Sequence, residues 1–232
     1  MASALARGWG EPVLASDSGS GRAQALVDEL GGERLSNAEV FERADLVILA
    51  HKPYQLADVA AGITTDKPIV SILGRGTVAE IEAVYPRSPV IRVEPNTPAA
   101  VRRGVSVLAA SERPEAQAVR ELFERVGTVV EVPERLLDVA GAVTGVGPAY
   151  WALFVEAYTD AAIRHGIPAA QAATLVTETM AGTAALLSQT DTLALRRGVT
   201  SPGGSTARGL AALERGGVRA ALAEAMDDVV GG

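Results

Sequence analysis

The segment Thr200–Thr206 combines glycines and hydroxyl groups immediately before a predicted helix. It reads Thr-Ser-Pro-Gly-Gly-Ser-Thr, and a helical pattern follows over residues 204–215. Backbone N–H groups at the start of a helix attract anions, and hydroxyl side chains add further donors. The alternative is an ordinary loop in which Ser205 or Thr206 caps the helix. If the segment is a carboxylate receptor, its donors come from Ser201, Gly203, Gly204, Ser205 and Thr206.

Two further polar segments follow predicted strands. Asn96-Thr97-Pro98 comes directly after a strand expected at 90–93, and a strand at 46–50 runs into Ala50, His51, Lys52 and Pro53. Ligands of open α/β sheets bind beyond the carboxyl ends of the strands. Asn96 and Lys52 are therefore candidates to face a ligand. The alternatives are an Asx or proline turn at Asn96 and a solvated loop lysine at Lys52. His51 has no charged partner visible in the sequence and is predicted to be a wall residue.

The first residues fit the middle of a nucleotide-binding motif. Met1–Gly8 has a helical composition with no strand before it, and a strand that reaches Ser16 is followed by Asp17. A doubly wound domain normally opens with a strand, a glycine-rich turn and a helix that receives a pyrophosphate, with an acid about 20 residues further on. In that register Met1 and Ala2 end the glycine pattern, and Asp17 is the ribose-binding acid. The alternative is a plain terminal helix followed by a turn aspartate.

Composition excludes several classes of function. The chain has 232 residues, no cysteine, two histidines and a formal net charge of -7. Disulfides, thiolate metal sites and cysteine nucleophiles are ruled out, and a histidine-built metal centre is not expected. The acidic balance argues against nucleic acid as the main partner. We also expect no membrane partner and a cytoplasmic location, because the longest apolar runs are strand-sized and no signal peptide is visible.

The first half of the chain alternates short β-branched runs with amphipathic segments. The runs predict strands at 13–16, 46–50, 69–72, 90–93, 105–109 and 128–132. Near-continuous apolar strands separated by helices are typical of a parallel sheet that is covered on both faces. We therefore expect an α/β fold with a Rossmann-like doubly wound sheet over residues 1–133, lacking its first strand.

After Pro133 the predicted strands stop and only helices follow. They are expected at 134–143, 148–165, 168–187, 192–197, 204–215 and 218–230, with Pro148 and Pro168 in first turns, where proline is tolerated. We expect residues 134–232 to form an all-helical domain that binds substrate and supplies a subunit interface.

Four motifs in this order and spacing resemble the pyrroline-5-carboxylate reductase family across essentially the whole chain. They are Ile48–Pro53, Val93–Pro98, Gly145–Tyr150 and Thr200–Thr206. The resemblance implies a reductase that uses NADPH or NADH to convert the cyclic imine 1-pyrroline-5-carboxylate into L-proline, the last step of proline biosynthesis. It also implies a Rossmann domain and a homodimer formed through the helical domain, with higher oligomers built from dimers.

The resemblance also assigns roles to individual residues. Thr206 and Asn96 are implied to be catalytic, and Asn96 also to orient the nicotinamide or the substrate ring. Thr144, Gly145 and Val146 are implied to face the substrate, together with the carboxylate receptor. Asp17 favours NADH because it accepts a 2'-hydroxyl, whereas Ser18, Ser20 and Arg22 favour NADPH if they form a phosphate pocket. The sequence leaves this choice open.

Three departures from the family pattern put the substrate in question. Glu94 stands where the family usually has methionine, Val146 replaces a serine, and Gly74-Arg75-Gly76 replaces a small apolar stretch. Two alternatives therefore stay open, a non-catalytic homologue or scaffold and a reductase of another cyclic imine acid. We expect the chain as given to bind dinucleotide poorly if the first strand and glycine loop are absent.

Overall fold

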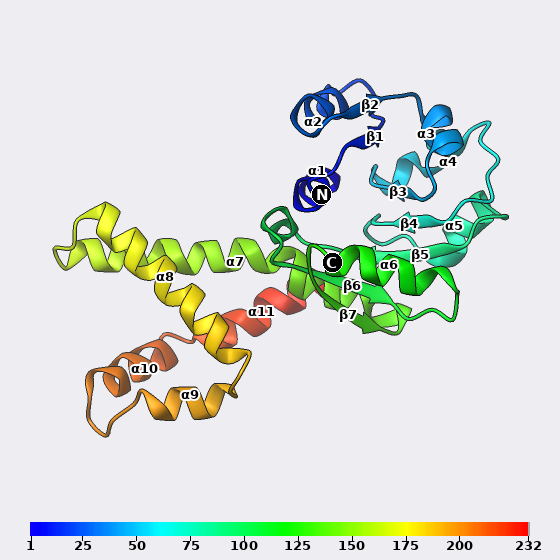
Figure 1. Cartoon of the computed structure of the whole chain (residues 1–232). Helices are drawn as coiled ribbons and strands as arrows, with labels where there is room; N and C mark the ends of the chain where they lie inside the picture. The colour runs from blue at the N-terminus through cyan, green and yellow to red at the C-terminus, as the bar shows by residue number, and fades with distance from the viewer. Residues whose placement is uncertain (232) are drawn as a thin grey trace. The chain divides into compact units, whose positions relative to one another are not determined.

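The computed structural model describes residues 1–231 and divides the chain into two compact units, Met1–Pro148 and Ala149–Gly232. The first unit holds two sheets and most of the short helices (Figure 1). Its strands are β1 (Val13–Ala15), β2 (Gly32–Arg34), β3 (Val47–Leu49), β4 (Ile69–Ser71), β5 (Val90–Glu94), β6 (Gly104–Ala109) and β7 (Gly127–Val132). Its helices are α1 (Ala2–Trp9), α2 (Arg22–Leu30), α3 (Asn37–Arg43), α4 (Leu56–Ala60), α5 (Val78–Val84) and α6 (Glu115–Glu124), with short 3-10 turns η1 (Pro53–Gln55), η2 (Thr97–Val101) and η3 (Glu134–Leu136).

The sheet order confirms a doubly wound architecture with two differences from the expectation. Strands β3 to β7 form one sheet in sequential order, and β1 pairs with β2 in a separate parallel ribbon. Strand β2 was not predicted from the sequence. The sheet is also not wholly parallel, because β5 and β6 run antiparallel with Val93 opposite Leu108. The connection between them is short enough for a direct reversal, whereas a parallel pairing needs a crossover of a dozen or more residues.

Alternation along the strands sends side chains to two separate cores. Leu5 of α1 and Phe123 of α6 pack with Ile91 and Val93 on one face of the sheet. Helices α3, α4 and α5 pack with Val90 and other strand residues on the opposite face. Because side chains alternate with a period of two, Arg92 and Glu94 lie on this second face together with Val90.

The close packing of α1 depends on a glycine. A Cβ added at Gly8 would overlap the carbonyl oxygen of Ala99 and would lie 2.8 Å from Cγ1 of Val126. Helix α1 therefore approaches η2 at backbone distance. The helix predicted over Met1–Gly8 is confirmed, and Gly8 is what lets it lie against the sheet.

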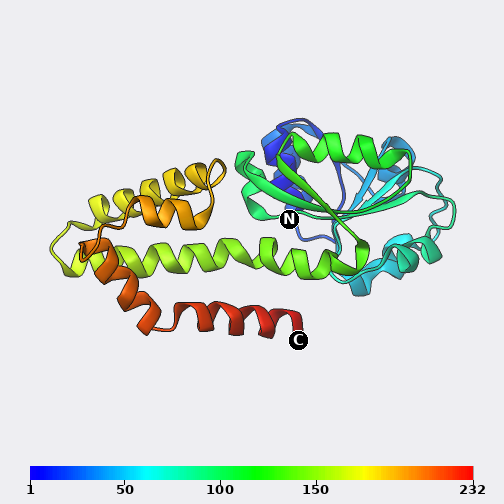
Figure 2. The ribbon, with the colours of Figure 1, turned by 90° about the horizontal axis from the view of Figure 1, so that it is seen from below.

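The second unit is entirely helical in the part of the chain that the structure describes. Helix α7 (Leu137–Arg164) begins in the first unit and ends in the second. It is followed by α8 (Ala169–Leu187), α9 (Thr192–Gly198), α10 (Ser205–Arg215) and α11 (Val218–Gly231), which succeed one another in Figure 2. The predicted break before Pro148 is wrong, because α7 is continuous and Pro148 lies inside it. Because proline has no N–H, the Thr144 carbonyl lacks its usual helical donor and accepts from a side chain outside the helix.

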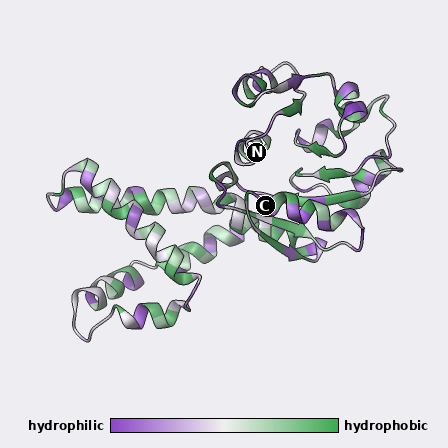
Figure 3. Cartoon of the chain, viewed as in Figure 1, coloured by the Kyte–Doolittle hydropathy of each residue, from purple (hydrophilic) through white to green (hydrophobic). Residues whose placement is uncertain are grey.

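Helix α7 is unusually apolar for its exposure. The stretch Glu134–Arg164 has a mean hydropathy of 1.2 over its most apolar window, of which 17% is buried, so by length and composition it could cross a membrane. This corrects the expectation that all apolar runs are strand-sized. Length and composition alone argue only weakly for a membrane span, because a helix at a subunit interface shares them. Apolar residues recur along the helices in Figure 3.

Candidate active site

The carboxyl ends of β3, β4 and β5 lie at one edge of the sheet, because these three strands are parallel. The amino end of β6 reaches the same edge, since β6 runs antiparallel to β5. The polar segments that follow β3 and β5 are therefore brought to one edge, where ligands of such sheets bind.

Asn96 is held by two hydrogen bonds and is buried. Its Oδ1 accepts from the backbone N–H of Val105 at 2.8 Å, and its Nδ2 donates to the carbonyl oxygen of Thr144 at 3.1 Å. Thr144 lies on α7, four residues before Pro148. Proline has no N–H, so the Thr144 carbonyl loses its normal helical partner and is free to accept from Asn96. The proline inside α7 thus joins two predicted site residues.

The residues implied to face the substrate lie on α7 rather than in a turn. Thr144, Gly145 and Val146 are all helical, and a Cβ added at Gly145 would meet no atom within 4 Å among the described residues. This surface of the helix is open.

The segment after β3 is partly exposed at the same edge. The backbone N–H of Lys52 donates to Oε1 of Gln55 at 3.0 Å, and the side chains of Lys52, Ala50 and Pro53 are exposed. Nδ1 of His51 lies 2.8 Å from the carbonyl oxygen of Lys52, and its Nε2 is buried without a partner among the described residues. An orphaned ring nitrogen at a strand end fits a cofactor that brings its own polar group.

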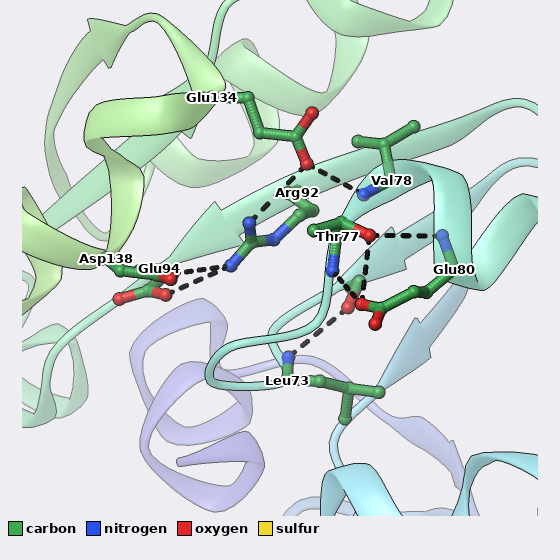
Figure 4. A network of polar contacts seen from close by, with 9 residues as sticks. Leu73, Thr77, Val78, Glu80, Arg92, Glu94, Glu134 and Asp138 are labelled. Atoms are coloured by element: carbon green, nitrogen blue, oxygen red, sulfur yellow. Dashed lines mark hydrogen bonds and ion pairs between the residues drawn. The ribbon is translucent and has the colours of Figure 1, made fainter.

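A cluster of charged residues lies on the α7 side of the same sheet edge (Figure 4). Arg92 is 3% exposed, and its guanidinium contacts Asp138 at 2.9 Å, Glu94 at 3.4 Å and Glu134 at 3.5 Å. Glu134 also accepts from the backbone N–H of Val78 at 2.7 Å, at the start of α5. A buried arginine needs such partners, because an unpaired buried charge is very costly.

Glu94 is the carboxyl group with an altered acidity in this cluster. Burial and, second to it, the neighbouring Asp138 carboxylate together raise the pKa of Glu94 to about 7, against the opposing effect of Arg92. A Cβ added at Gly141 would overlap Oε2 of Glu94. The glycine in α7 therefore provides the space that this carboxyl group occupies.

Asp17 lies at the end of β1, where its carboxylate organises a turn. It accepts from the N–H groups of Gly19 and Ala23 at 3.0 Å and from the hydroxyl of Ser20 at 2.8 Å. These bonds, led by that from Ala23, lower the pKa of Asp17 to about 2. Ser18 and Arg22 are exposed beside it.

A polar pocket of about 490 Å³ opens next to this turn. Its lining includes Arg34, whose Nη2 lies 3.9 Å from Oδ1 of Asp17. The other lining residues are Ser16, Leu35, Ser36, Asn37 and Glu39. The Arg34 cation, the hydroxyls and the amide fit the ribose and phosphate groups of a dinucleotide, whereas the carboxylates of Asp17 and Glu39 fit ribose hydroxyls but repel a phosphate. Met1 and Ala2 lie at the start of α1, with Met1 as its N-cap residue.

The Thr200–Thr206 segment forms the loop before α10 in the second unit. The N-cap residue of α10 is Gly204, which has no side chain to accept from the first backbone N–H groups of the helix. Neither Ser205 nor Thr206 is therefore the cap. Gly203 has a φ of 70°, a left-handed conformation suited to glycine, and Gly204 N–H donates to the Ser201 carbonyl at 3.0 Å. The uncapped start of α10 leaves N–H groups for an anion.

Sequence reasoning missed Arg92, Asp138, Glu134 and Arg34 as residues near the site. Arg92 carried the one available signal, a charged residue within an otherwise apolar strand. Two of its three acidic partners, Glu134 and Asp138, lie 42 and 46 positions later in the chain, too far for local spacing to identify them.

Two family models match the chain. One, described as pyrroline-5-carboxylate reductase dimerisation, covers residues 134–231. The other, described as NADP oxidoreductase coenzyme F420-dependent, covers residues 1–75.

Relatives and solved structures agree with these matches. A pyrroline-5-carboxylate reductase of Synechocystis is 39% identical over 82% of this chain and 74% of that protein, and one of Mycobacterium tuberculosis is 37% identical over 87% and 79%. The Streptococcus pyogenes enzyme structure has a TM-score of 0.87 and 28% identity, over 99% of this chain and 93% of that one. The Plasmodium falciparum enzyme structure with NADP bound has a TM-score of 0.86 and 26% identity, over 98% and 90%. The chain belongs to the pyrroline-5-carboxylate reductase family.

Proposed function

We propose that the chain reduces 1-pyrroline-5-carboxylate to L-proline with a nicotinamide cofactor, the last step of proline biosynthesis. The observation that carries this proposal is the junction of Asn96 and Thr144 at the ligand-binding edge of the sheet, in a member of this family. The Asn96 side-chain amide thereby joins the segment after β5 to the middle of α7, two parts of the chain that are far apart in the sequence.

The reaction asks little acid–base chemistry of the protein. A protonated imine is already electrophilic at carbon, and a bound nicotinamide supplies the hydride. The protein has to hold the substrate carboxylate and align the ring. We assign the first task to Ser201, Gly203, Gly204, Ser205 and Thr206 at the start of α10, and the second to Asn96 with Thr144, Gly145 and Val146. Thr206 and Asn96 are the catalytic residues of this proposal.

We assign the cofactor to the strand ends and the start of α1. Ala50, His51, Lys52 and Pro53 line its nicotinamide side, and Met1, Ala2, Asp17, Ser18 and Arg22 its adenosine side. NADPH is the proposed form, because the oxygens of Asp17 already accept three hydrogen bonds and Arg34 supplies a cation at the pocket. A 2'-phosphate can form an ion pair with Arg34, whereas a 2'-hydroxyl would have to donate to a carboxylate of Asp17 that already accepts other hydrogen bonds.

We also propose the assembly and its setting. Residues 1–133 form the dinucleotide-binding domain, and residues 134–232 form the domain that pairs two copies into a homodimer. Higher oligomers are built from such dimers. The apolar surface of α7 then has a protein partner, which supports a cytoplasmic location.

The direct test is NADPH oxidation by the purified chain with 1-pyrroline-5-carboxylate. Thr206→Val removes one hydroxyl, and we expect kcat/KM to fall about 10- to 100-fold, the loss of a hydrogen bond to a charged group. Thr192→Val, an exposed threonine at the start of α9, is the matched control. Turnover only of a six-membered imine acid would support the other substrate, and no turnover with either cofactor would support a non-catalytic homologue.

A further inference from the structure

The charges around Arg92 do not balance. One guanidinium faces three carboxyl groups, Glu94 on the same strand, Glu134 on η3 and Asp138 on α7. Glu80 on α5 also acts electrostatically with Arg92. With Glu94 ionised, three negative charges would surround one positive charge, and Glu94 and Asp138 would repel each other at the contact between β5 and α7.

A proton on one of the two carboxyl groups would avoid this repulsion, because two carboxyl groups can share a hydrogen bond only when one of them carries a proton. Both face the same nitrogen atom, since Nη2 of Arg92 lies 3.4 Å from Glu94 and 2.9 Å from Asp138. Gly141 makes room for the Glu94 carboxyl group, which is 19% exposed, whereas Asp138 is 56% exposed, so burial favours the proton on Glu94.

This pair of carboxyl groups lies next to the proposed substrate site. Glu94 precedes Asn96 by two residues on β5, and Asp138 and Gly141 precede Thr144 on α7. The hydrogen bond from Asn96 to the Thr144 carbonyl joins the same two elements slightly further along. Any loosening of α7 from β5 at Glu94 therefore changes the contact between Asn96 and Thr144.

We propose that Glu94 is a positioning residue, whose proton donated to Asp138 fastens the first turns of α7 to the end of β5 and so sets Asn96 and Thr144 for the substrate. This role in positioning the substrate rests on the proposed reductase function. The fastening of α7 does not, and it is measurable in the chain without substrate.

The expected consequence is a loosening of α7 as the pH rises from weakly acidic to neutral. The raised pKa of Glu94, about 7, places the loss of the proton within the working range of a neutral assay. Once Glu94 is ionised, the hydrogen bond is replaced by repulsion from Asp138, and Arg92 is left to hold both elements.

The first experiment measures hydrogen exchange of the backbone amides of residues 139–145 between pH 5 and pH 9, corrected for intrinsic rates. Glu94→Gln keeps a hydrogen-bond donor to Asp138 but does not titrate. Glu131→Gln makes the same change at an exposed site on β7 and is the control. In the unchanged chain and the control we expect protection to fall by up to about tenfold per pH unit as the pH rises toward the folded-state pKa of Glu94, about 7, and to level off above it, for one linked proton. Protection in Glu94→Gln should stay level, and parallel curves in all three would overturn the proposal.

Gly141→Ala offers a second route to the same result. Its added methyl group overlaps the Glu94 carboxyl, so the amides should be weakly protected even at pH 6. Full protection at pH 6 in this variant would contradict the proposed fastening.

Activity then separates the two proposals. The KM for the imine should rise above pH 7 in the unchanged chain and stay lower in Glu94→Gln, with the titration of the substrate common to both. If the ratio of the KM values of the unchanged chain and Glu94→Gln is the same at every pH, the positioning role is rejected. If no variant has reductase activity at any pH, the proposed function fails, the positioning role falls with it, and the exchange data still decide whether the proton holds α7.

Discussion

Asn96 connects two elements with a single amide group. Its oxygen accepts from β6 and its nitrogen donates to a carbonyl on α7 that Pro148 leaves without a helical partner. A proline inside a helix normally costs about 3 kcal/mol. Here part of that cost is offset, because the freed carbonyl fixes the side chain that lies at the ligand edge.

Pro148→Ala tests this link between the helix and the site. Alanine restores an N–H that competes with Asn96 for the Thr144 carbonyl, so we expect the free energy of unfolding to stay the same or rise while kcat/KM falls about tenfold or more. Thermal unfolding and steady-state kinetics measure the two effects. A fall in both quantities would instead mean that Pro148 serves packing.

The proposed preference for NADPH rests on Arg34. Arg34→Ala should weaken NADPH binding by at least about tenfold, the loss of a charge-assisted hydrogen bond, and leave NADH nearly unchanged. Fluorescence titration with each nucleotide measures both affinities. Arg22→Ala, an exposed arginine at the start of α2, is the control, and a larger effect there would move the phosphate to the site that the sequence first suggested.

Single residues were predictable where a local motif carried them. Asn96 and the Thr200–Thr206 segment stand out in the sequence through composition and neighbouring elements, and Thr144 through the family resemblance, and the roles of all three stay predictions. The salt-bridge cluster of Arg92 was not predictable, because its partners come from η3 and α7 and meet only after the sheet has formed. The raised pKa of Glu94 depends on burial, which a local pattern does not reveal.

Helix α1 is an element whose place is set by the absence of a side chain. Gly8→Ala should raise helix propensity by about 1 kcal/mol, but the overlap with Ala99 outweighs this gain. We expect a net loss of about 1–3 kcal/mol in the free energy of unfolding, measured by urea denaturation. Gly209→Ala in α10, where a Cβ meets nothing within 4 Å among the described residues, should be neutral or stabilising.

Element types were predicted well, and connections less so. The central strands and most helices follow from apolar periodicity, which is a local property. Strand β2 is exposed throughout, so it had no apolar pattern to reveal it. The direction of β6 and the continuity of α7 depend on tertiary contacts, the pairing with β5 and the hydrogen bond from Asn96.

At the scale of the whole molecule, α7 carries apolar side chains that need a partner. Trp151, Leu153 and Tyr158 are 57%, 64% and 66% exposed. Large exposed apolar groups of this kind mark protein interfaces. Leu153→Glu should therefore shift a dimer toward monomer by at least about tenfold in dissociation constant, as burial of an unpaired charge would require.

Light scattering on a size-exclusion column measures this shift. Val130→Glu introduces the same charge at an exposed apolar position on β7 and should leave the mass unchanged. Equal masses for the unchanged chain and both variants would place the interface elsewhere.

The antiparallel pairing of β5 with β6 also has a kinetic consequence. Its connection, residues 95–103, closes a shorter loop than the crossovers that precede β5 and follow β6. Short loops lose less chain entropy on closure, so contacts across them form early. We expect this hairpin to belong to the folding nucleus, with high φ-values at Val93 and Leu108. Asn96 would then accept its hydrogen bond from Val105 before α7 packs against the sheet. The strand side of the ligand-binding edge would therefore form before the helix side.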